Sequence, residues 1–540
     1  MKYGPVRKHL HPITMEVFFV LYTQICSGSV YGVEGRIITV EVDISNGLPQ
    51  VNIVGLPDPA VRESVERVRA AVKNCGFTFP MERITVNLAP ADLRKEGTAF
   101  DLAIAAGILT ASGQLKSRLF QGLLVLGELA LNGELRAIPG VLAMVEQARL
   151  SGITKVLLPK SNAAEAACLE GMQLFGVTHL SELSNAAVDE SAWEQLRYRA
   201  DCSIDSASMG LCKEKGIGSD DFGDVLGQHH AKRALLIAAC GQHNVLLSGP
   251  PGTGKTMLAR RLPGIMPPLS DVEALQVTKI YSAAGKLPGG IPTLMRERPF
   301  RSPHHTISSA GLIGGGSIPR PGEVTLAHRG LLFLDELPEF SRSALEVLRQ
   351  PLEDREVTIS RSRAVFRFPS HFLLAASMNP CPCGYYGHDT DEHRCVCSEL
   401  ALARYRAKIS GPLLDRIDMH IEVPRPPSTE GLKSGMNSAQ MREIVLAATE
   451  RRNARTTKGS MRPPAELAGA SLRKAVHMTR EAEQLLRSAF DNLGVSLRAH
   501  DRILKLSRTI ADLEASDCVD SQHVAEAIGY RSLDRKLHAI

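Results

Sequence analysis

The sequence predicts an α/β fold with a core of alternating strands and helices, a mixed α/β block before it and a helical block after it. Three observations indicate this organisation. An apolar strand pattern leads directly into the Gly-rich stretch 249–256, and a helical pattern follows it. Strand and helix patterns alternate over residues 23–199. Residues 439–540 show helical spacing without strand patterns.

The composition is that of an ordinary globular protein, with 44% hydrophobic and 22% charged residues. The net charge of +5 is spread over 540 residues and does not by itself indicate nucleic acid. Every apolar run is shorter than the roughly 20 residues that cross a bilayer, so we expect no membrane partner. Seven of the eleven cysteines lie singly, which favours a reducing cytoplasm over a disulfide framework.

Polar stretches that contain Ser and Gly predict the domain boundaries. Residues 1–22 hold basic residues and a short apolar run without a small-residue cleavage site, so we expect a disordered extension. Linkers are expected at 200–221 and 425–438. The domains that these segments separate are 23–199, 222–424 and 439–540.

The first of these domains contains patterns of both kinds. Alternation predicts strands at 36–44, ended by Ser-Asn-Gly, and at 83–90. Helical spacing predicts a helix over 59–76, and an apolar run predicts a buried helix over 99–112. Asn132-Gly133 lies between two further strand patterns and predicts a hairpin.

The first candidate site is the stretch "GPPGTGKT", which fits the phosphate-loop pattern G-x-x-x-x-G-K-[ST] in full. Its glycines let backbone N–H groups close around phosphates, and the N-terminus of the following helix adds a positive dipole end. We expect Lys255 to reach the β- and γ-phosphates of ATP and Thr256 to ligate Mg²⁺. The predicted nucleotide-binding residues are Gly249, Pro250, Pro251, Gly252, Thr253, Gly254, Lys255 and Thr256.

Polar residues at the ends of two later strands complete the predicted ATP site. The apolar strand in "GLLFLDELPEF" ends at Asp335, which would hold Mg²⁺, and Glu336, which would polarise the attacking water. The alternative is an Asp-Glu pair that only starts a helix. The strand in "FLLAASMNP" ends at Asn379, whose amide would orient the lytic water and sense the γ-phosphate.

Two arginines are candidates for contact with the phosphates. Arg416 follows a rigid turn in "SGPLLDRID", and an arginine donated to a neighbour's phosphate raises the rate by orders of magnitude. The alternative for Arg416 is an ion pair with Asp415 or Asp418. Arg498 opens a helix in the last block, from which it could contact the nucleotide, and Arg502 is the weaker candidate.

The order of these parts resembles the AAA+ class of ATPases, and specifically its magnesium-chelatase-like family. The motifs that carry the resemblance are "GQHHAKRALLIAACGQHNVLLSGPPGTGKT", "RPFRSPHHTISSAGLIGGG", "PGEVTLAHRGLLFLDELPEF" and "GPLLDRIDMHIEVP". The resemblance implies ATP hydrolysis with Mg²⁺, a helical lid after the core, and a ring of identical subunits, usually six. In such a ring Arg416 need not face the nucleotide of its own subunit.

Within this family the chain is similar, from about Thr23 onwards, to competence proteins that act as DNA branch-migration helicases in natural transformation. Two stretches favour DNA as the partner. Residues 296–323 are rich in Arg, His and Gly, and the alternation over 356–372 predicts a hairpin that displays Arg361 and Arg363. In a ring such hairpins can face the pore. The alternative is a solvated hairpin or a contact between subunits.

Residues 127–166 resemble the proteolytic domain of Lon, which implies an α+β domain of the ribosomal protein S5 domain 2-like fold. Lon pairs a Ser nucleophile with a Lys base, and hydrolysis needs both. Here Ala99 stands at the position of the nucleophile, and the four residues Val141–Met144 after "IPG" include no lysine. Thr98 is adjacent, but no obvious base accompanies it. We therefore expect a domain without peptidase activity, used for ring assembly or DNA contact.

Four cysteines form two Cys-x-Cys pairs separated by eleven residues: Cys381, Cys383, Cys395 and Cys397. Two converging thiolate pairs can complete a tetrahedral Zn²⁺ shell, although the usual spacing is Cys-x₂₋₄-Cys. His388 and His393 are spare ligand candidates. A disulfide clip and a reduced loop are the alternatives, and we favour a metal or a disulfide over bare thiols. A bound metal or a disulfide would each stabilise the strand that ends at Asn379.

Three functions follow from these patterns, and the first is favoured. It is a ring-forming, ATP-driven motor on branched or single-stranded DNA. The alternative is a chelatase-type ATPase that remodels a partner protein for Mg²⁺ insertion into a tetrapyrrole. The Lon-like block, which the chelatase subunit lacks, favours the DNA motor. An ATP-dependent protease is disfavoured by the missing Ser/Lys pair.

Overall fold

The computed structural model describes residues 22–184, 190–199, 220–287, 294–316, 319–361, 364–388, 394–425, 435–455, 463–493 and 497–531. These residues form two compact units: the first contains the described residues before 201 and a short segment that begins at Gly285, and the second contains the others. The disordered extension predicted at 1–22 and the linker predicted at 200–221 lie almost entirely outside the described residues. In the described part of the chain, no helix is both long enough and apolar enough to cross a bilayer.

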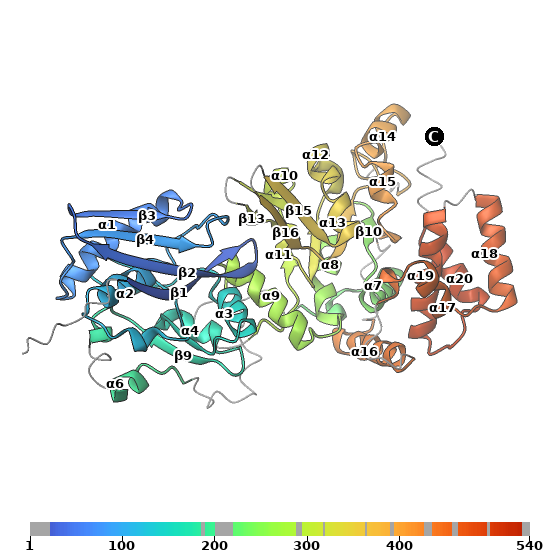
Figure 1. Ribbon diagram of the computed structural model, residues 1–540. Coiled ribbons are helices and arrows are strands. Elements are labelled where there is room, and N and C mark those ends of the chain that lie inside the picture. The colour runs from blue at the N-terminus through green and yellow to red at the C-terminus, as the bar shows by residue number, and fades with distance from the viewer. Residues whose placement is uncertain are drawn as a thin grey trace, which may run out of the picture. The chain divides into compact units, whose positions relative to one another are not determined.

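The N-terminal unit contains a mixed sheet of seven strands in the order β3-β4-β2-β1-β5-β8-β9 (Figure 1). The strands are β1 (Tyr22–Tyr31), β2 (Glu34–Ser45), β3 (Gln50–Val54), β4 (Arg83–Ala89), β5 (Leu123–Val125), β8 (Lys155–Pro159) and β9 (Gln173–Val177). β2 pairs antiparallel with β1 and β4, and the other neighbours pair parallel. The predicted strands at 36–44 and 83–90 are confirmed, and both bury alternate side chains.

The helices of this unit are α1 (Pro59–Asn74), α2 (Asp101–Ala111), the 3₁₀ turn η1 (Ser117–Phe120), α3 (Val141–Leu150), α4 (Lys160–Ala166) and α6 (Glu190–Gln195). α1 begins after Asp58, whose carboxylate accepts the Val61 N–H at 2.8 Å as an N-cap. α2 is buried along its full length between α1 and the strands β1 and β2. Both predicted helices are therefore confirmed. So is the hairpin at Asn132-Gly133, which joins β6 (Glu128–Leu129) to β7 (Leu135–Arg136).

The positions compared with a protease dyad make other contacts, and so does Lys95, a nearby lysine that was not singled out from the sequence. Ala99 lies two residues before the start of α2, and the hydroxyl of Thr98 donates to a carboxylate oxygen of Glu128. The amine of the buried Lys95 donates to two backbone carbonyl oxygens, and burial lowers its pKa. Val141–Met144 are buried in the first turn of α3. The Thr98 hydroxyl and the Lys95 amine thus have separate partners and do not form a nucleophile–base pair.

The second unit contains a parallel sheet of five strands in the order β11-β14-β17-β10-β18. The strands are β10 (Val245–Ser248), β11 (Phe300–Arg301), β14 (Leu331–Leu334), β17 (Leu373–Met378) and β18 (Met419–Glu422). β10, β14 and β17 are buried throughout, as expected for a parallel sheet covered by helices. The helices and 3₁₀ turns between and around these strands are η2 (Phe222–Asp224), α7 (His229–Gly241), α8 (Lys255–Ile265), α9 (Asp271–Ala283), α10 (Ser309–Ile313), α11 (Glu323–Leu326), η3 (Leu337–Glu339), α12 (Arg342–Glu346), α13 (Arg349–Asp354), α14 (Glu399–Arg406) and α15 (Gly411–Leu414).

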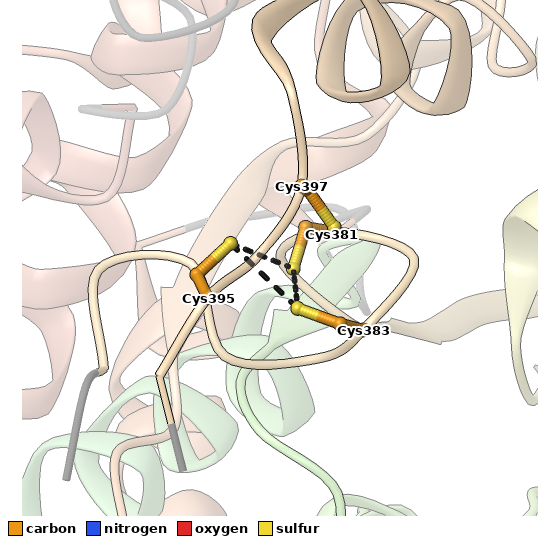
Figure 2. A group of neighbouring side chains, drawn as sticks. All are labelled: Cys381, Cys383, Cys395 and Cys397. Carbon is orange, nitrogen blue, oxygen red and sulfur yellow. Dashed lines mark hydrogen bonds between the residues drawn. The ribbon is translucent and has the colours of Figure 1, made fainter.

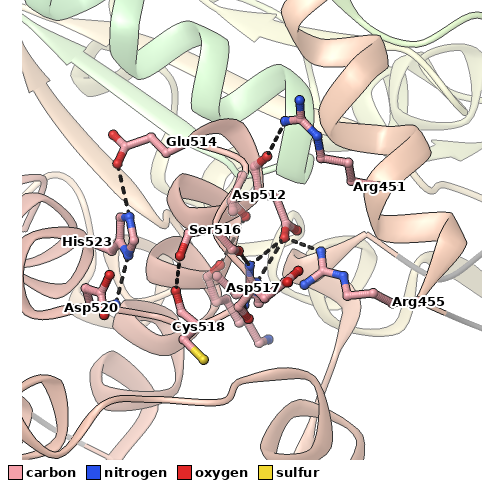
Figure 3. A network of polar contacts seen from close by, with 12 residues as sticks. Arg451, Arg455, Asp512, Glu514, Ser516, Asp517, Cys518, Asp520 and His523 are labelled. Atoms are coloured by element: carbon pink, nitrogen blue, oxygen red, sulfur yellow. Dashed lines mark hydrogen bonds and ion pairs between the residues drawn. The ribbon is translucent and has the colours of Figure 1, made fainter.

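The C-terminal part is helical, as predicted, and packs directly on the sheet unit. Its elements are α16 (Ser438–Ala454), η4 (Pro464–Glu466), α17 (Gly469–Ala475), α18 (Arg480–Leu493), α19 (Leu497–Leu513) and α20 (Ser521–Gly529). α16 and α19 both contact α7, so one hydrophobic core runs from the sheet into these helices. A polar network adds to this packing: the buried carboxylate of Asp512 in α19 accepts a hydrogen bond from Arg455, which follows α16 (Figure 3), and another from the buried Arg508 at 3.0 Å.

Candidate active site

Three buried strands place the predicted ATP-site residues at one edge of the second sheet. β17 lies between β14 and β10 and pairs in parallel with both. The carboxyl ends of parallel neighbours meet at the same edge, which is where open α/β sheets bind ligands. The residues that follow β10, β14 and β17 are Gly249, Asp335 and Asn379. The fold thus brings together the phosphate loop, the carboxylate pair and the amide.

The phosphate loop turns directly into α8. Gly254 has a φ of 84° and caps the helix, a conformation that suits glycine and aims backbone N–H groups into the loop. The amine of Lys255 donates to the carbonyl oxygens of Gly249 at 2.7 Å and Pro250 at 2.8 Å, and to Oδ1 of Asn379 at 3.3 Å. Burial lowers the pKa of Lys255, although the carboxylates nearby act in the opposite direction. This amine is positioned to exchange its backbone partners for phosphate oxygens.

A hydroxyl and a carboxylate form the predicted Mg²⁺ ligand pair. Oγ1 of Thr256 donates to Oδ2 of Asp335 at 2.8 Å, and Ser377 donates to the other carboxylate oxygen. Oxygen ligands of this kind are those that Mg²⁺ prefers, so the donor set fits the ion. The sequence patterns did not identify Ser377. Its signal was a single polar residue inside the otherwise apolar strand β17.

The second carboxylate, Glu336, is accessible to water. Its backbone has a φ of 54°, and its side chain is 57% exposed. Nδ1 of His305 lies 3.7 Å from Oε2 of Glu336. His305 was not singled out from the sequence, although it belongs to the Arg- and His-rich stretch. An exposed carboxylate beside the predicted Mg²⁺ ligands has the placement expected of a group that polarises water.

Arg416 follows α15 and makes contacts within its own chain. One guanidinium nitrogen donates to a carboxylate oxygen of Glu353, and the other terminal nitrogen donates to the carbonyl of Pro412 at 2.8 Å. The ion pair that the sequence suggested with Asp415 or Asp418 is therefore made with Glu353 instead.

Arg416, Arg498 and Arg502 line one cavity of about 370 Å³. Two other lining residues are Asn244, which precedes β10, and Asp418, which precedes β18. The cavity therefore lies at the amino ends of the neighbouring parallel strands β10 and β18, and the phosphate loop follows the carboxyl end of β10. A strand of this length spans about 13 Å. Both candidate arginines thus lie across the sheet from the phosphate loop of their own chain.

The predicted hairpin over 356–372 is confirmed as β15 (Glu356–Arg361) and β16 (Ala364–Pro369). Val357, Ile359, Phe366 and Phe368 are buried, and Arg361, at the end of β15, is exposed. Arg361 donates to the carbonyl of Gly316 at 3.1 Å, which joins this hairpin to a second, shorter one, β12 (Gly314–Gly315) with β13 (Arg320–Pro321). Arg363 lies outside the described residues. Two hairpins of the core, both from the stretches that favoured DNA, thus lie side by side.

The four cysteines converge (Figure 2). All four sulfur atoms lie within 4.8 Å of one another, and Cys381 is fully buried. The Sγ–Sγ distances are 3.2 Å for Cys381–Cys383, 3.8 Å for Cys381–Cys395 and 3.6 Å for Cys383–Cys395. These exceed the roughly 2.0 Å of a disulfide bond, so the disulfide alternative is not the arrangement in this structure. His388 is not part of the group, and His393 lies outside the described residues.

Comparisons with protein families match three parts of the chain. Residues 221–430 match the family described as "Magnesium chelatase, subunit ChlI". Residues 40–162 match "Subunit ChlI of Mg-chelatase", and residues 435–531 match "Magnesium chelatase, subunit ChlI C-terminal".

Two similar proteins match nearly the whole chain, and a third matches a smaller part of it. "Uncharacterized protein YifB" of Salmonella typhimurium is 42% identical over 509 residues, which are 94% of this chain and 96% of YifB. "Competence protein ComM" of Haemophilus influenzae is 42% identical over 512 residues, 94% of this chain and 97% of ComM. "Lon protease 2" of Bacillus subtilis is 33% identical over 175 residues, 30% of each chain.

Proposed function

Because this chain belongs to the magnesium-chelatase-like family of AAA+ ATPases, together with YifB and ComM, we propose that it is a ring-forming ATP hydrolase that moves DNA. The preferred substrate is branched or single-stranded DNA, and the process is branch migration during the recombination step of natural transformation. The observation that carries the proposal is the pair of adjacent hairpins at Arg361, in a chain that matches a competence protein over 94% of its length.

The position of Arg416 supports a ring. It shares its cavity with Arg498, across the sheet from the phosphate loop of the same chain. A guanidinium can stabilise the transition state of phosphoryl transfer only if it reaches the phosphates. If the phosphate loop of a neighbouring copy lay against this cavity, both arginines could contact the phosphates bound there. We infer that Arg498, like Arg416, acts on the neighbour's ATP, in a homo-hexamer.

The cofactors of this activity are ATP and Mg²⁺. Lys255 and the loop 249–254 hold the phosphates, and Thr256 and Asp335 hold the metal. Zn²⁺ would be a third component, with a structural role at the four-cysteine cluster. The motor would work in the cytoplasm, where ATP is abundant and thiols stay reduced.

We expect the ATPase rate to rise when single strands or a four-way junction are added, and the double variant Arg361→Ala/Arg363→Ala to lose this rise while keeping its basal rate. Arginines at a pore hairpin contact the phosphate backbone and are not part of the ATP site. The slope of log affinity against log salt should also fall by about 1 to 2 in the variant. Arg442→Ala/Arg473→Ala, which removes two exposed arginines from α16 and α17, is the matched control. Stimulation equal to that of the unmodified chain in the hairpin variant would exclude these hairpins as the contact.

The family descriptions also support a second candidate function, that of a chelatase-type ATPase that remodels a partner protein. The match of residues 40–162 carries the chelatase subunit's name, so the N-terminal block does not separate the two functions in the way that the sequence suggested. The extent of the match to ComM favours DNA. Measuring ATP turnover with single strands, duplex and a four-way junction decides between them, because a chelatase-type remodeller responds to none of the three.

We expect no hydrolysis of casein in the presence of ATP. The Thr98 hydroxyl and the Lys95 amine have separate partners, and Ala99 offers no nucleophile. A gel-based degradation assay with a Lon protease as positive control measures this directly. ATP-dependent loss of casein would restore the protease as a candidate function.

A further inference from the structure

The spacing of the four sulfur atoms is that of a metal shell. A tetrahedral Zn²⁺ with Zn–S bonds of about 2.3 Å places its sulfurs about 3.8 Å apart. Three of the Sγ–Sγ distances in the cluster are 3.2, 3.6 and 3.8 Å, close to this value. All four sulfur atoms lie within 4.8 Å of one another. Soft thiolate ligands in a tetrahedral set select Zn²⁺ over the hard ion Mg²⁺ of the ATP site. The cluster is therefore a site separate from the one that Thr256 and Asp335 form.

Backbone donors around Cys381 are a second, independent observation. The N–H groups of Gly384 and Tyr386 donate to Sγ of Cys381 at 3.2 Å and 3.3 Å. Hydrogen bonds of this kind stabilise a thiolate and orient it as a metal ligand. A neutral thiol buried at this position would have little need for two donors. The turn that supplies them depends on Gly384, whose φ is 92°.

The same turn touches the phosphate loop. A Cβ atom placed on Gly384 would lie 2.8 Å from Cδ of Pro251, so the Gly384 turn lies close against the ring of Pro251 and leaves no room for a side chain there. Cys381 is also only two residues beyond Asn379, the amide that accepts a hydrogen bond from Lys255. The cluster thus lies against two parts of the ATP site at once.

A third connection runs to the helix that leads towards Arg416. Cys397 is followed by Ser398, which caps α14 through the Ala401 N–H at 3.3 Å. The guanidinium of Arg406, at the end of α14, lies 5.3 Å from the ring centroid of Tyr386 in the cysteine turn. α14 therefore begins and ends in contact with the cluster's own loops.

We propose that Cys381, Cys383, Cys395 and Cys397 bind one Zn²⁺, and that the metal holds the Gly384 turn against Pro251, so that loss of Zn²⁺ weakens nucleotide binding. The metal site itself stands on the sulfur geometry and on the backbone donors to Cys381, and it does not depend on the proposed function. The effect on nucleotide rests on the proposed function, because it requires that the phosphate loop binds ATP or ADP.

The first test is the metal content of the full chain, purified without metal-affinity tags. Elemental analysis should find about one zinc per chain. The double variant Cys383→Ser/Cys395→Ser should lose it, and Cys168→Ser/Cys518→Ser, which alters two cysteines outside the cluster, should keep it. Exchange of the metal for Co²⁺ should produce the visible absorption bands of a tetrahedral cobalt thiolate. Absence of zinc together with absence of cobalt bands, or recovery of the four cysteines as disulfides, would overturn the metal site.

The second test measures ADP affinity, before and after the zinc is removed from the unmodified chain with a chelator and then restored. We expect ADP to bind about tenfold more weakly without zinc, a typical coupling between two sites, and to recover when Zn²⁺ is added back. Thermal unfolding in parallel shows that the chelated chain is still folded. Equal ADP affinity in the two forms would disprove the coupling and leave the metal site standing. A chain that contains zinc but binds no ADP in either form would count against the proposed function and against the coupling that rests on it.

Discussion

Replacing Glu336 by glutamine should lower the rate of ATP hydrolysis by about 10²- to 10⁴-fold, the usual contribution of a group that activates water. Affinity for ATP should change little, since Glu336 is an exposed side chain and the phosphates are held by the loop and by Lys255. Turnover under saturating ATP, and binding of a fluorescent ATP analogue, separate the two effects.

The matched control for this variant is Glu339→Gln. Glu339 lies three residues further along the same turn and pairs with Lys408 on the surface at 3.2 Å. The two substitutions remove the same negative charge, but Glu339 is not placed to act on water at the phosphates. The role assigned to Glu336 would be contradicted if both variants kept the rate of the unmodified chain, or if both lost it equally.

Replacing Arg416 by alanine should lower the ATPase rate by about 10³- to 10⁵-fold, the effect of removing an arginine that stabilises the transferred phosphoryl group. The loss should come from a missing contact between subunits. Arg416 lies across the sheet from its own phosphate loop, in the cavity that also holds Arg498.

Mixing two inactive chains tests this assignment. Arg416→Ala keeps an intact phosphate loop, and Lys255→Ala keeps an intact Arg416. In a mixed ring the second chain supplies its arginine to the nucleotide of the first, so we expect activity to return on mixing. Arg404→Ala, which removes an exposed arginine of α14, should have no effect on its own. A mixture that co-assembles but remains inactive would show that Arg416 does not act between subunits.

Local patterns were enough to predict several of the elements. The alternation in 356–372 predicted the hairpin β15–β16, and the apolar run before "GPPGTGKT" predicted β10. Such patterns show which face of one helix or strand is buried. They can be recognised in a short run of consecutive residues, without knowledge of the rest of the fold. The phosphate loop was predicted residue by residue for the same reason, because its chemistry is contained in eight consecutive positions.

Contacts between distant positions could not be predicted in this way. Ser377 donates a hydrogen bond to Asp335 because β17 lies next to β14, between β14 and β10. The sequence of a single strand does not specify which strands lie beside it in the sheet. His305 reaches Glu336, and Glu353 takes the ion pair expected for Asp415 or Asp418, for similar reasons. Each of these contacts requires two or more elements to be placed at once.

The sequence by itself determined the fold class, the phosphate loop and the presence of four cysteines in pairs. Only the tertiary structure decided that Arg498 lies beside Arg416, and that the cysteine turn touches Pro251. The physical reason is that helix and strand periods are set by local geometry, whereas the approach of two loops is set by how the buried faces of several elements pack into one core.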